Sequence, residues 1–343
     1  MEENIVCNIS YNKPINIDEW NALCESNGNL LCSTFYDKVQ AHYNQKSIYF
    51  HFYNNEELLA GVKLYQWESR KIPFILPLIS KRLSQFGEYV LKPNINENDI
   101  LHAIITREVK NFIKKSKAVS FTSGGFYGQE NLILNPFNQK NKIEFDVAYI
   151  DLTKSMDELK ANMHPKHKNM LNKSIKSNLI FIKNVEIKIL IQMLDETYKN
   201  QVKSGPSHEF IKNLSKHLIN EGKAKIFAVN DEYDKTLSVA LVCICGNTAD
   251  YTFGGNIHNS LGAGQFLQWN IFEYLKTIGV KQYSLGQIAK SDVVYNNPKF
   301  EEGISRFKSR FGIERKNCFK QKTILNKFKY FLFNKLLILT KIK

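Results

Sequence analysis

The chain has 343 residues and a formal net charge of +14 at pH 7, with 43% hydrophobic and 12% aromatic residues. A chain of this length corresponds to about two domains, and this apolar content can fill their cores, so a largely disordered protein is excluded. The positive charge favours anionic partners, namely nucleic acid, phospholipid headgroups or phosphorylated cosubstrates, without choosing among them.

The N-terminus is acidic at Glu2 and Glu3 and has no apolar run behind it, so we expect no secretory signal. No stretch approaches the ~18–20 apolar residues that a membrane-spanning helix needs. The six cysteines show no metal-ligand spacing, which predicts buried free thiols, no metal site and a reducing compartment. We therefore expect a cytoplasmic protein, peripheral at the inner membrane face if its C-terminal tail contacts lipid.

Hydrophobic periodicity predicts an α/β pattern in the first half of the chain. Its predicted elements are helices at 16–26 and 34–42, a hairpin of strands at 48–53 and 58–67, a strand at 85–91, a helix at 98–115 and a strand at 118–122. The polar, aperiodic residues 135–144 then predict a domain boundary, which gives an N-terminal domain over 1–144.

The second half opens with a predicted strand at 145–152, and Ser155 with Glu158 has the spacing of a helix capping box. Pro165 suits the first turn of a following basic helix. The further predicted elements are helices at 187–203 and 207–221 and strands at 224–229 and 237–245. Residues 48–125 and 224–286 then share one order: strand, turn, strand, strand, helix, strand. We predict two copies of one α/β unit with mixed sheets, of which the second spans 145–315.

A glycine loop in the second unit is the first candidate site. A predicted strand at 251–255 is followed by Gly262, Ala263, Gly264 and Gln265, which lead into a predicted helix at 265–275 and a strand at 282–286. N–H groups at a helix N-terminus bind phosphate oxygens, and glycine lets the chain approach an anion closely. The loop lacks the Lys-Ser/Thr of a Walker motif, so a plain strand-to-helix turn is an equal alternative.

The second candidate is the sequence Phe307-Lys308-Ser309-Arg310-Phe311-Gly312, in which one cation stands between aromatic residues. Such a lysine can stabilise a developing oxyanion or a phosphate, whereas the spacing alone favours a solvated basic helix end with two core phenylalanines. The third candidate is the basic helix that carries Lys166 and Lys168, which could grip phosphates or simply face water. Asp250, Asp292, Glu301 and Glu302 are candidate general bases that the sequence does not rank.

The tail over 316–343 is predicted to be one basic, apolar helix, and no acidic residue follows Glu314. Lysines interleaved with phenylalanine and leucine suit a helix that lies on an anionic membrane surface. A helix that packs its apolar face on the first domain is the alternative, and both can hold together.

Taken together, several stretches resemble the Fem transferases of peptidoglycan interpeptide bridges and their FemAB-like relatives in the GNAT acyltransferase superfamily. They are His164-Pro165-Lys166-His167-Lys168-Asn169-Met170 with Lys173, Tyr251-Thr252-Phe253-Gly254-Gly255, Gln268-Trp269, Tyr283-Ser284-Leu285-Gly286 and Phe307-Lys308 with Phe311-Gly312. The resemblance covers about residues 145–315. It implies two tandem GNAT-like domains, with the C-terminal helix returning to the first.

The resemblance also implies an acyl- or aminoacyltransferase that acts on an amino group of a cell-envelope glycan or peptidoglycan precursor. Lys308, beside Phe307, would steady the tetrahedral intermediate, and residues 262–265 would bind the donor. Tyr251, Tyr283, Gln287, Lys166 and Lys168 are expected on the acceptor side of the cleft. The donor would be a cosubstrate, aminoacyl-tRNA or acyl-CoA, with no permanently bound cofactor, and the acceptor would be nucleotide- or lipid-linked.

The sequence departs from the family pattern: lysine and histidine stand in the basic helix where arginine is frequent, Tyr283-Ser284 stands where Tyr-Asp is common, the coiled-coil arm of some members is absent, and the first domain shows little specific match. Two alternatives therefore stay open. One is an acyl-CoA-dependent GNAT N-acyltransferase of surface-polysaccharide biosynthesis. The other is a non-catalytic module that binds RNA or anionic lipid on a degenerate transferase fold.

Overall fold

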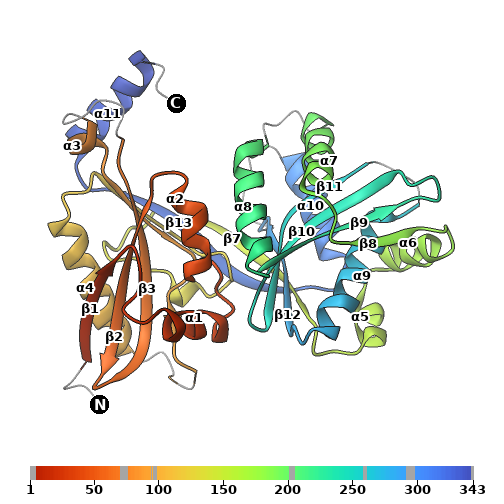
Figure 1. Cartoon of the computed structure of the whole chain (residues 1–343), viewed down its shortest axis with the longest axis horizontal. Coiled ribbons are helices and arrows are strands. Elements are labelled where there is room, and N and C mark those ends of the chain that lie inside the picture. The colour runs from red at the N-terminus through yellow and green to blue at the C-terminus, as the bar shows by residue number, and fades with distance from the viewer. Residues whose placement is uncertain are drawn as a thin grey trace. The chain divides into compact units, whose positions relative to one another are not determined.

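The computed structural model describes residues 5–69, 76–93, 95, 99–200, 205–257, 261–290 and 298–340 (Figure 1). The chain divides into two compact units, Met1–Glu144 with Asn317–Lys343 and Phe145–Lys316. The break after Glu144 coincides with the end of the polar stretch 135–144. The C-terminal segment belongs to the first unit, as the predicted fold requires.

The first unit is a mixed sheet in the order β1-β2-β3-β4-β6-β13, with β5 paired to β3. Its strands are β1 (Ile5–Tyr11), β2 (Lys46–Asn54), β3 (Glu57–Trp67), β4 (Arg82–Phe86), β5 (Val90–Leu91), β6 (Ser120–Gly124) and β13 (Glu314–Ile324). Its helices are α1 (Ile17–Ser26), η1 (Thr34–Tyr36), α2 (Asp37–Ala41), α3 (Leu76–Ser80), α4 (Asp99–Lys115), η2 (Glu130–Leu132) and α11 (Lys327–Thr340).

Alternation along β2 gives this sheet two buried faces, because successive side chains of a strand point to opposite sides. Phe50 and Phe52 join the α4 residues Ile105 and Val109 in one core. Tyr49, which directly precedes Phe50 and points to the opposite side, packs with α1 residues in a second core. Figure 1 shows α4 on one side of the sheet and α1 with α2 on the other.

The second unit repeats this order as β8-β9-β10-β11-β12-β7. Its strands are β7 (Ile143–Asp151), β8 (Ile180–Lys183), β9 (Ala224–Asn230), β10 (Thr236–Cys245), β11 (Thr248–Asn256) and β12 (Gln282–Ile288). Its helices are α5 (Met156–Asn162), α6 (Pro165–Ile175), α7 (Ile187–Asn200), α8 (His208–Asn220), α9 (Ala263–Thr277) and α10 (Pro298–Ser309). Residues of α5, α6 and α9 form the core on one face of this sheet, and α7 and α8 contact β9, β10 and β11.

The strand pairing confirms that the two units share one topology. In each, four consecutive strands pair antiparallel, antiparallel and then parallel, as β2-β3-β4-β6 and as β9-β10-β11-β12. A long helix, α4 or α9, crosses over between the two parallel strands, as parallel neighbours require. The fold is therefore α/β, with mixed sheets of one topology in both units.

The prediction of one helix over 316–343 is wrong for its first part, because Glu314–Ile324 forms strand β13. Gln321 and Thr323 are buried while Lys320 and Lys322 are exposed, a period of two that suits a strand whose one face is covered. The predicted strand at 85–91 is also two strands, β4 and β5, because Gly87 interrupts it with a φ of +80°. The sequence reading missed β1, β8 and α10.

Candidate functional site

The parallel strands β11 and β12 separate partway along their length. They pair only at Thr248 with Gln282, Ala249 with Tyr283 and Asp250 with Ser284. Beyond these pairs β11 continues to Asn256 and β12 to Ile288 without pairing to each other. Backbone N–H and C=O groups of both strands therefore border an opening in the sheet, where a ligand can pair with them.

Two local irregularities coincide with this separation. Opposite β10, Tyr251 pairs with Val242 and Phe253 with Leu241, so Thr252 is the extra residue of a β-bulge. In β12, Gly286 has a φ of +81°, and the register with β7 shifts at that residue. Residues other than glycine rarely adopt this backbone conformation. The bulge and the glycine turn each strand away from the other at the same level of the sheet.

Helix α9 is the next element after β11: the strand ends at Asn256 and the helix begins at Ala263. Residues 258–260 between them are not described. Its N-cap is Gly262, with a φ of +78°, and a Cβ there would lie 2.8 Å from the Met170 carbonyl oxygen of α6. A Cβ on Gly264 would lie 3.0 Å from Asn256 Oδ1 and 3.5 Å from Phe307 Cζ. The glycines of the predicted donor loop thus let the helix start close to α6, β11 and α10. The first N–H groups of such a helix have no partner within it and attract anions.

Lys308 reaches the opening from α10. Its Nζ donates a hydrogen bond to the Gln287 carbonyl oxygen at 3.0 Å, and a Cβ on Gly286 would lie 3.4 Å from that Nζ. The same Cβ would lie 3.8 Å from the Tyr251 carbonyl oxygen, so Lys308, β11 and β12 meet at this point. Burial lowers the pKa of Lys308 to about 8, so the side chain remains largely an ammonium at pH 7.

Phe307 and Phe311 hold the Lys308 turn against the core. Their rings meet edge to face with centroids 5.2 Å apart, and Phe311 is buried against Phe272 of α9. Gly312 ends this turn with a φ of +77°, and a Cβ there would lie 2.6 Å from the Asn162 carbonyl oxygen. The spacing Phe-Lys-x-x-Phe-Gly therefore has a packing reason: two aromatic anchors fix the backbone that carries the lysine.

His167 is a site residue that the sequence reading passed over. It is 2% exposed, and its ring lies 5.3 Å from Phe307 and 4.7 Å from Phe311, centroid to centroid. Burial, then the charges of Arg310 and His164, lower its pKa to about 4, so the imidazole is neutral at pH 7. Its Nδ1 has no hydrogen-bond partner among the residues that the structure describes. The one sequence feature that pointed to His167 was its position among the basic residues of the predicted helix.

Asn256 is a second residue that the sequence did not indicate. It ends β11, its Oδ1 accepts a hydrogen bond from the buried Ser238 hydroxyl, and its side chain lies beside Gly264. Ser238 thus fixes an amide at the start of α9.

The other predicted cleft residues fall into different places. Tyr251 is half-buried and its hydroxyl lies over Gly254, where any Cβ would overlap it. Gln287 is exposed and contributes its carbonyl group to Lys308. Lys166 is exposed, whereas Lys168 Nζ donates to the Ala161 carbonyl oxygen at the end of α5, at 2.7 Å.

Tyr283 does not line a cleft, so that prediction is wrong. It is 0% exposed, its hydroxyl donates to Gln268 Oε1 of α9 at 3.0 Å, and its ring packs on Phe272. An inward position of β12 next to the crossover helix buries this residue. The hydrogen bond explains why a tyrosine and a glutamine can both stay inside the core.

The candidate general bases remain unranked. Asp250 lies on β11 at the last residue that pairs with β12, and it is half-buried. Asp292 and the side chains of Glu301 and Glu302 lie outside the described residues.

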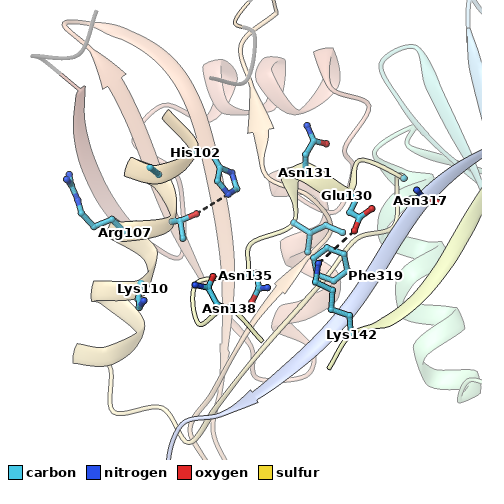
Figure 2. A pocket seen from close by; sticks show the side chains of 14 residues that line it. His102, Arg107, Lys110, Glu130, Asn131, Asn135, Asn138, Lys142, Asn317 and Phe319 are labelled. Carbon is cyan, nitrogen blue, oxygen red and sulfur yellow. Dashed lines mark hydrogen bonds and ion pairs between the residues drawn. The ribbon is translucent and has the colours of Figure 1, made fainter. Parts of the chain in front are cut away.

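The first unit holds a separate pocket of about 920 Å³ (Figure 2). Cations and amides border it: Arg107, Lys110, Lys142, Asn131, Asn135, Asn138 and Asn317. Some of these groups are already engaged, since Lys142 covers the Phe319 ring at 4.0 Å and Arg107 pairs with Glu108 at 3.0 Å. Glu130 also lines the pocket and pairs with Lys142 at 3.9 Å, so the lining suits a polar ligand. None of the residues predicted for catalysis lines it.

No protein family and no curated protein matches the sequence. Solved structures do resemble the fold. FemX aligns with a TM-score of 0.72 at 14% identity, over 94% of this chain and 99% of that one. L-PGS from Bacillus licheniformis aligns with a TM-score of 0.53 at 12% identity, over 96% and 98%.

A third likeness is to the C-terminal domain of a putative lysylphosphatidylglycerol synthetase from Agrobacterium fabrum. Its TM-score is 0.51 at 10% identity, over 94% of this chain and 95% of that one. At such identities the likeness shows the fold alone, which is the fold of FemX.

Proposed function

We propose that this chain, which has a FemAB-like fold, transfers an acyl or aminoacyl group to an amino group of a cell-envelope glycan or peptidoglycan precursor. One observation carries the proposal: the Lys308 ammonium lies where β11 and β12 separate. In the same unit, helix α9 follows β11 and has Gly262 as its N-cap. A half-buried cation beside unpaired strand edges can stabilise negative charge that develops on a carbonyl oxygen.

The donor binds at the start of α9 in this proposal. The helix has 15 residues, and its N-terminus at Gly262–Gln265 presents backbone N–H groups with a partial positive charge. Both proposed donors carry phosphates, on the 3′ end of a tRNA or on coenzyme A. The carbonyl of the transferred group would then extend between β11 and β12 towards Lys308.

The reaction is a nucleophilic acyl substitution. The acceptor amine attacks the carbonyl carbon, a C–N bond forms, and the carbonyl oxygen becomes an oxyanion that accepts a hydrogen bond from Lys308. The C–O bond of an ester donor, or the C–S bond of a thioester, then breaks. The amine proton leaves to a base or to water, and the donor oxygen or sulfur departs with the bonding electron pair. An amine with a pKa near 8 needs only a modest base.

Aminoacyl-tRNA is the donor we favour. One structural neighbour is named as a putative lysylphosphatidylglycerol synthetase, a name that joins a lysyl group to a phospholipid. A second is named L-PGS. FemX is the third. Arg306 is exposed on α10 and the half-buried Arg310 directly follows the helix, both close in sequence to Lys308, and such cations favour a polyanionic donor. Acyl-CoA remains the alternative donor.

A non-catalytic module is the alternative of another class, and the pocket of the first unit favours it. Its cations and amides would hold an anionic ligand without any chemistry at Lys308. This alternative predicts binding that does not depend on the second unit.

Donor binding tests these possibilities. The purified chain is titrated with acetyl-CoA, charged tRNA and uncharged tRNA at physiological salt, because non-specific RNA binding by a +14 protein is strong only at low salt. We expect tighter binding of charged than of uncharged tRNA. Saturable binding of acetyl-CoA instead would identify an acyl-CoA enzyme, and binding of neither would contradict the transferase proposal.

A matched pair of glycine variants localises the donor. Gly264→Val places methyl groups at the α9 N-terminus, where a Cβ already lies 3.0 Å from Asn256 Oδ1. Gly303→Val makes the same change within α10, where a Cβ meets nothing within 4 Å. We expect donor affinity to fall about tenfold or more for the first variant, as the loss of one charge-assisted contact implies, and to stay unchanged for the second. Equal affinities would place the donor elsewhere.

A further inference from the structure

Helix α11 carries exposed aromatic residues on one face. Phe328 is 74% exposed, Phe331 60% and Leu332 37%, at the spacing i, i+3, i+4 that places side chains on one side of a helix. The opposite face is buried, since Phe333 is 1% exposed and packs with Leu76 and Ile79 of α3. The helix is thus anchored to the first unit by one apolar face and presents a second one outward.

Helix α3 extends this outward surface. Its Leu78 is 67% exposed, and the Leu78 carbonyl oxygen accepts a hydrogen bond from Lys329 Nζ of α11 at 3.1 Å. Figure 1 shows the two helices side by side. We call Leu78, Phe328, Phe331 and Leu332 the α3–α11 apolar surface. Exposed large apolar side chains that gather in this way mark an interaction site rather than random surface composition.

Only cations accompany this surface on its own helix. Lys327 and Lys335 are exposed, and Lys335 Nζ lies 5.1 Å from the centre of the Phe331 ring. The sequence has no acidic residue after Glu314 and continues with Lys341 and Lys343. A second copy of the same surface would bring lysine against lysine, which disfavours self-association. Apolar rings with a lysine border complement a layer of acyl chains beneath anionic headgroups.

We propose that the α3–α11 apolar surface docks on an anionic phospholipid surface. The phenylalanine and leucine side chains enter the boundary between headgroups and acyl chains, while the lysines stay level with the phosphates. Within the described residues, no helix is long and apolar enough to cross a membrane, so the contact is peripheral. This inference stands on α3 and α11 alone and does not depend on the proposed chemistry at Lys308.

Vesicle flotation tests the proposal with the full chain. The probes are vesicles of phosphatidylcholine alone and vesicles with phosphatidylglycerol added, at physiological salt. We expect the wild-type chain to float with the anionic vesicles and to remain largely unbound with the neutral ones. Failure to float with anionic vesicles would overturn the proposal.

Two variants and a control separate apolar docking from charge alone. Phe328→Ser with Phe331→Ser should weaken partitioning about 100-fold, because each buried phenylalanine contributes about tenfold or more. Lys327→Gln with Lys335→Gln should weaken it about tenfold and make the rest less sensitive to salt. Tyr233→Ser is the control, because Tyr233 is 83% exposed on the turn between β9 and β10 of the second unit.

Each contrary result has one meaning. If the double serine variant floats like the wild type, the positive charge of the chain binds the vesicles and the proposal fails. If the wild type forms a dimer that the serine variant cannot form, and vesicles do not compete for it, the surface docks a second copy instead. All the substituted side chains are exposed, and circular dichroism with thermal unfolding would verify that the variants fold.

Discussion

The two units build the same parallel strand pair and finish it in opposite ways. In the first unit, β4 and β6 pair along their whole length, from Arg82 with Ser120 to Phe86 with Gly124. In the second, β11 and β12 pair at three positions and then separate. One topology therefore gives a closed sheet in one copy and an opening in the other, so the topology alone does not make a site.

The residues that follow the strands explain the closure of the first unit. Glu88, 2% exposed, follows β4, and its carboxylate accepts hydrogen bonds from the backbone N–H groups of Phe126, Tyr127 and Gln129 after β6. An internal carboxylate thus satisfies the N–H groups that would otherwise attract an anion. The second unit has Gly286 and Lys308 at its opening. The first unit is closed by its own carboxyl group, whereas the second offers a cation to an external anion.

The largest effect is expected at Lys308. Lys308→Ala should lower turnover by about 10²–10³-fold, which is the usual cost of one donor to a developing oxyanion. The unfolding free energy should not fall, because burial lowers the pKa of Lys308 and removal of the lysine relieves that cost. Steady-state kinetics and urea unfolding check both points, with Lys188→Ala as the control because Lys188 is exposed on the other face of the unit, on α7. Unchanged turnover would contradict a role for Lys308 in the reaction, and with it the functional difference between the open and the closed unit.

Glu88→Ala should show that the first unit uses its anion for structure. Loss of the acceptor leaves three backbone N–H groups without their partner and should cost about 2–4 kcal/mol of unfolding free energy. Turnover measured where the variant is still folded should remain that of the wild type. Urea unfolding gives the first quantity and kinetics the second. A large loss of turnover with unchanged stability would mean that Glu88 belongs to a reaction site.

His167 should make the second unit sensitive to acid. Its pKa of about 4 lies below the unfolded value near 6.5, so the unfolded chain binds a proton first as the pH falls. Stability contributed by the neutral ring is therefore present above pH 6.5 and decreases as the pH falls towards 4. Between pH 7 and 5 the loss should be about 2 kcal/mol by this linkage.

His167→Gln provides the comparison for this pH dependence. The variant has no group that titrates at this position, so the difference in unfolding free energy between pH 7 and pH 5 should shrink by that amount. Urea unfolding of both proteins at the two pH values gives the measurement. Identical pH dependences would show that His167 is protonated as easily in the folded chain as in the unfolded one.

The smallest effect concerns the charge of Lys308 itself. If the ammonium is the active form, turnover should decline as the pH rises through about 8, with a limiting slope of tenfold per pH unit. Lys308→Arg keeps its charge throughout this range and should abolish the decline, even if its turnover is lower. A pH profile of kcat for both proteins is the test. A decline that persists in the arginine variant would assign the titration to another group.

Much of the fold could be predicted from the sequence because the patterns are local. The alternation at 48–53, the helical spacing at 98–115 and the capping box at Ser155 specify their elements through neighbouring residues. The order of these elements also indicated the repeat. The strand Glu314–Ile324 was missed because its lysines resemble those of the basic, apolar helix that follows, and only its sheet partner β6 makes the period of two meaningful.

The sequence by itself determined the two-unit α/β topology, the glycine loop before α9 and the aromatic-flanked Lys308. Tertiary structure alone decided how far β11 pairs with β12, that Tyr283 lies in the core, and that His167 and Asn256 border the site. The reason is the range of the interactions. Periodicity and turns arise between residues a few positions apart, whereas the site joins residues such as His167 and Phe311, far apart in the chain, whose proximity only packing creates.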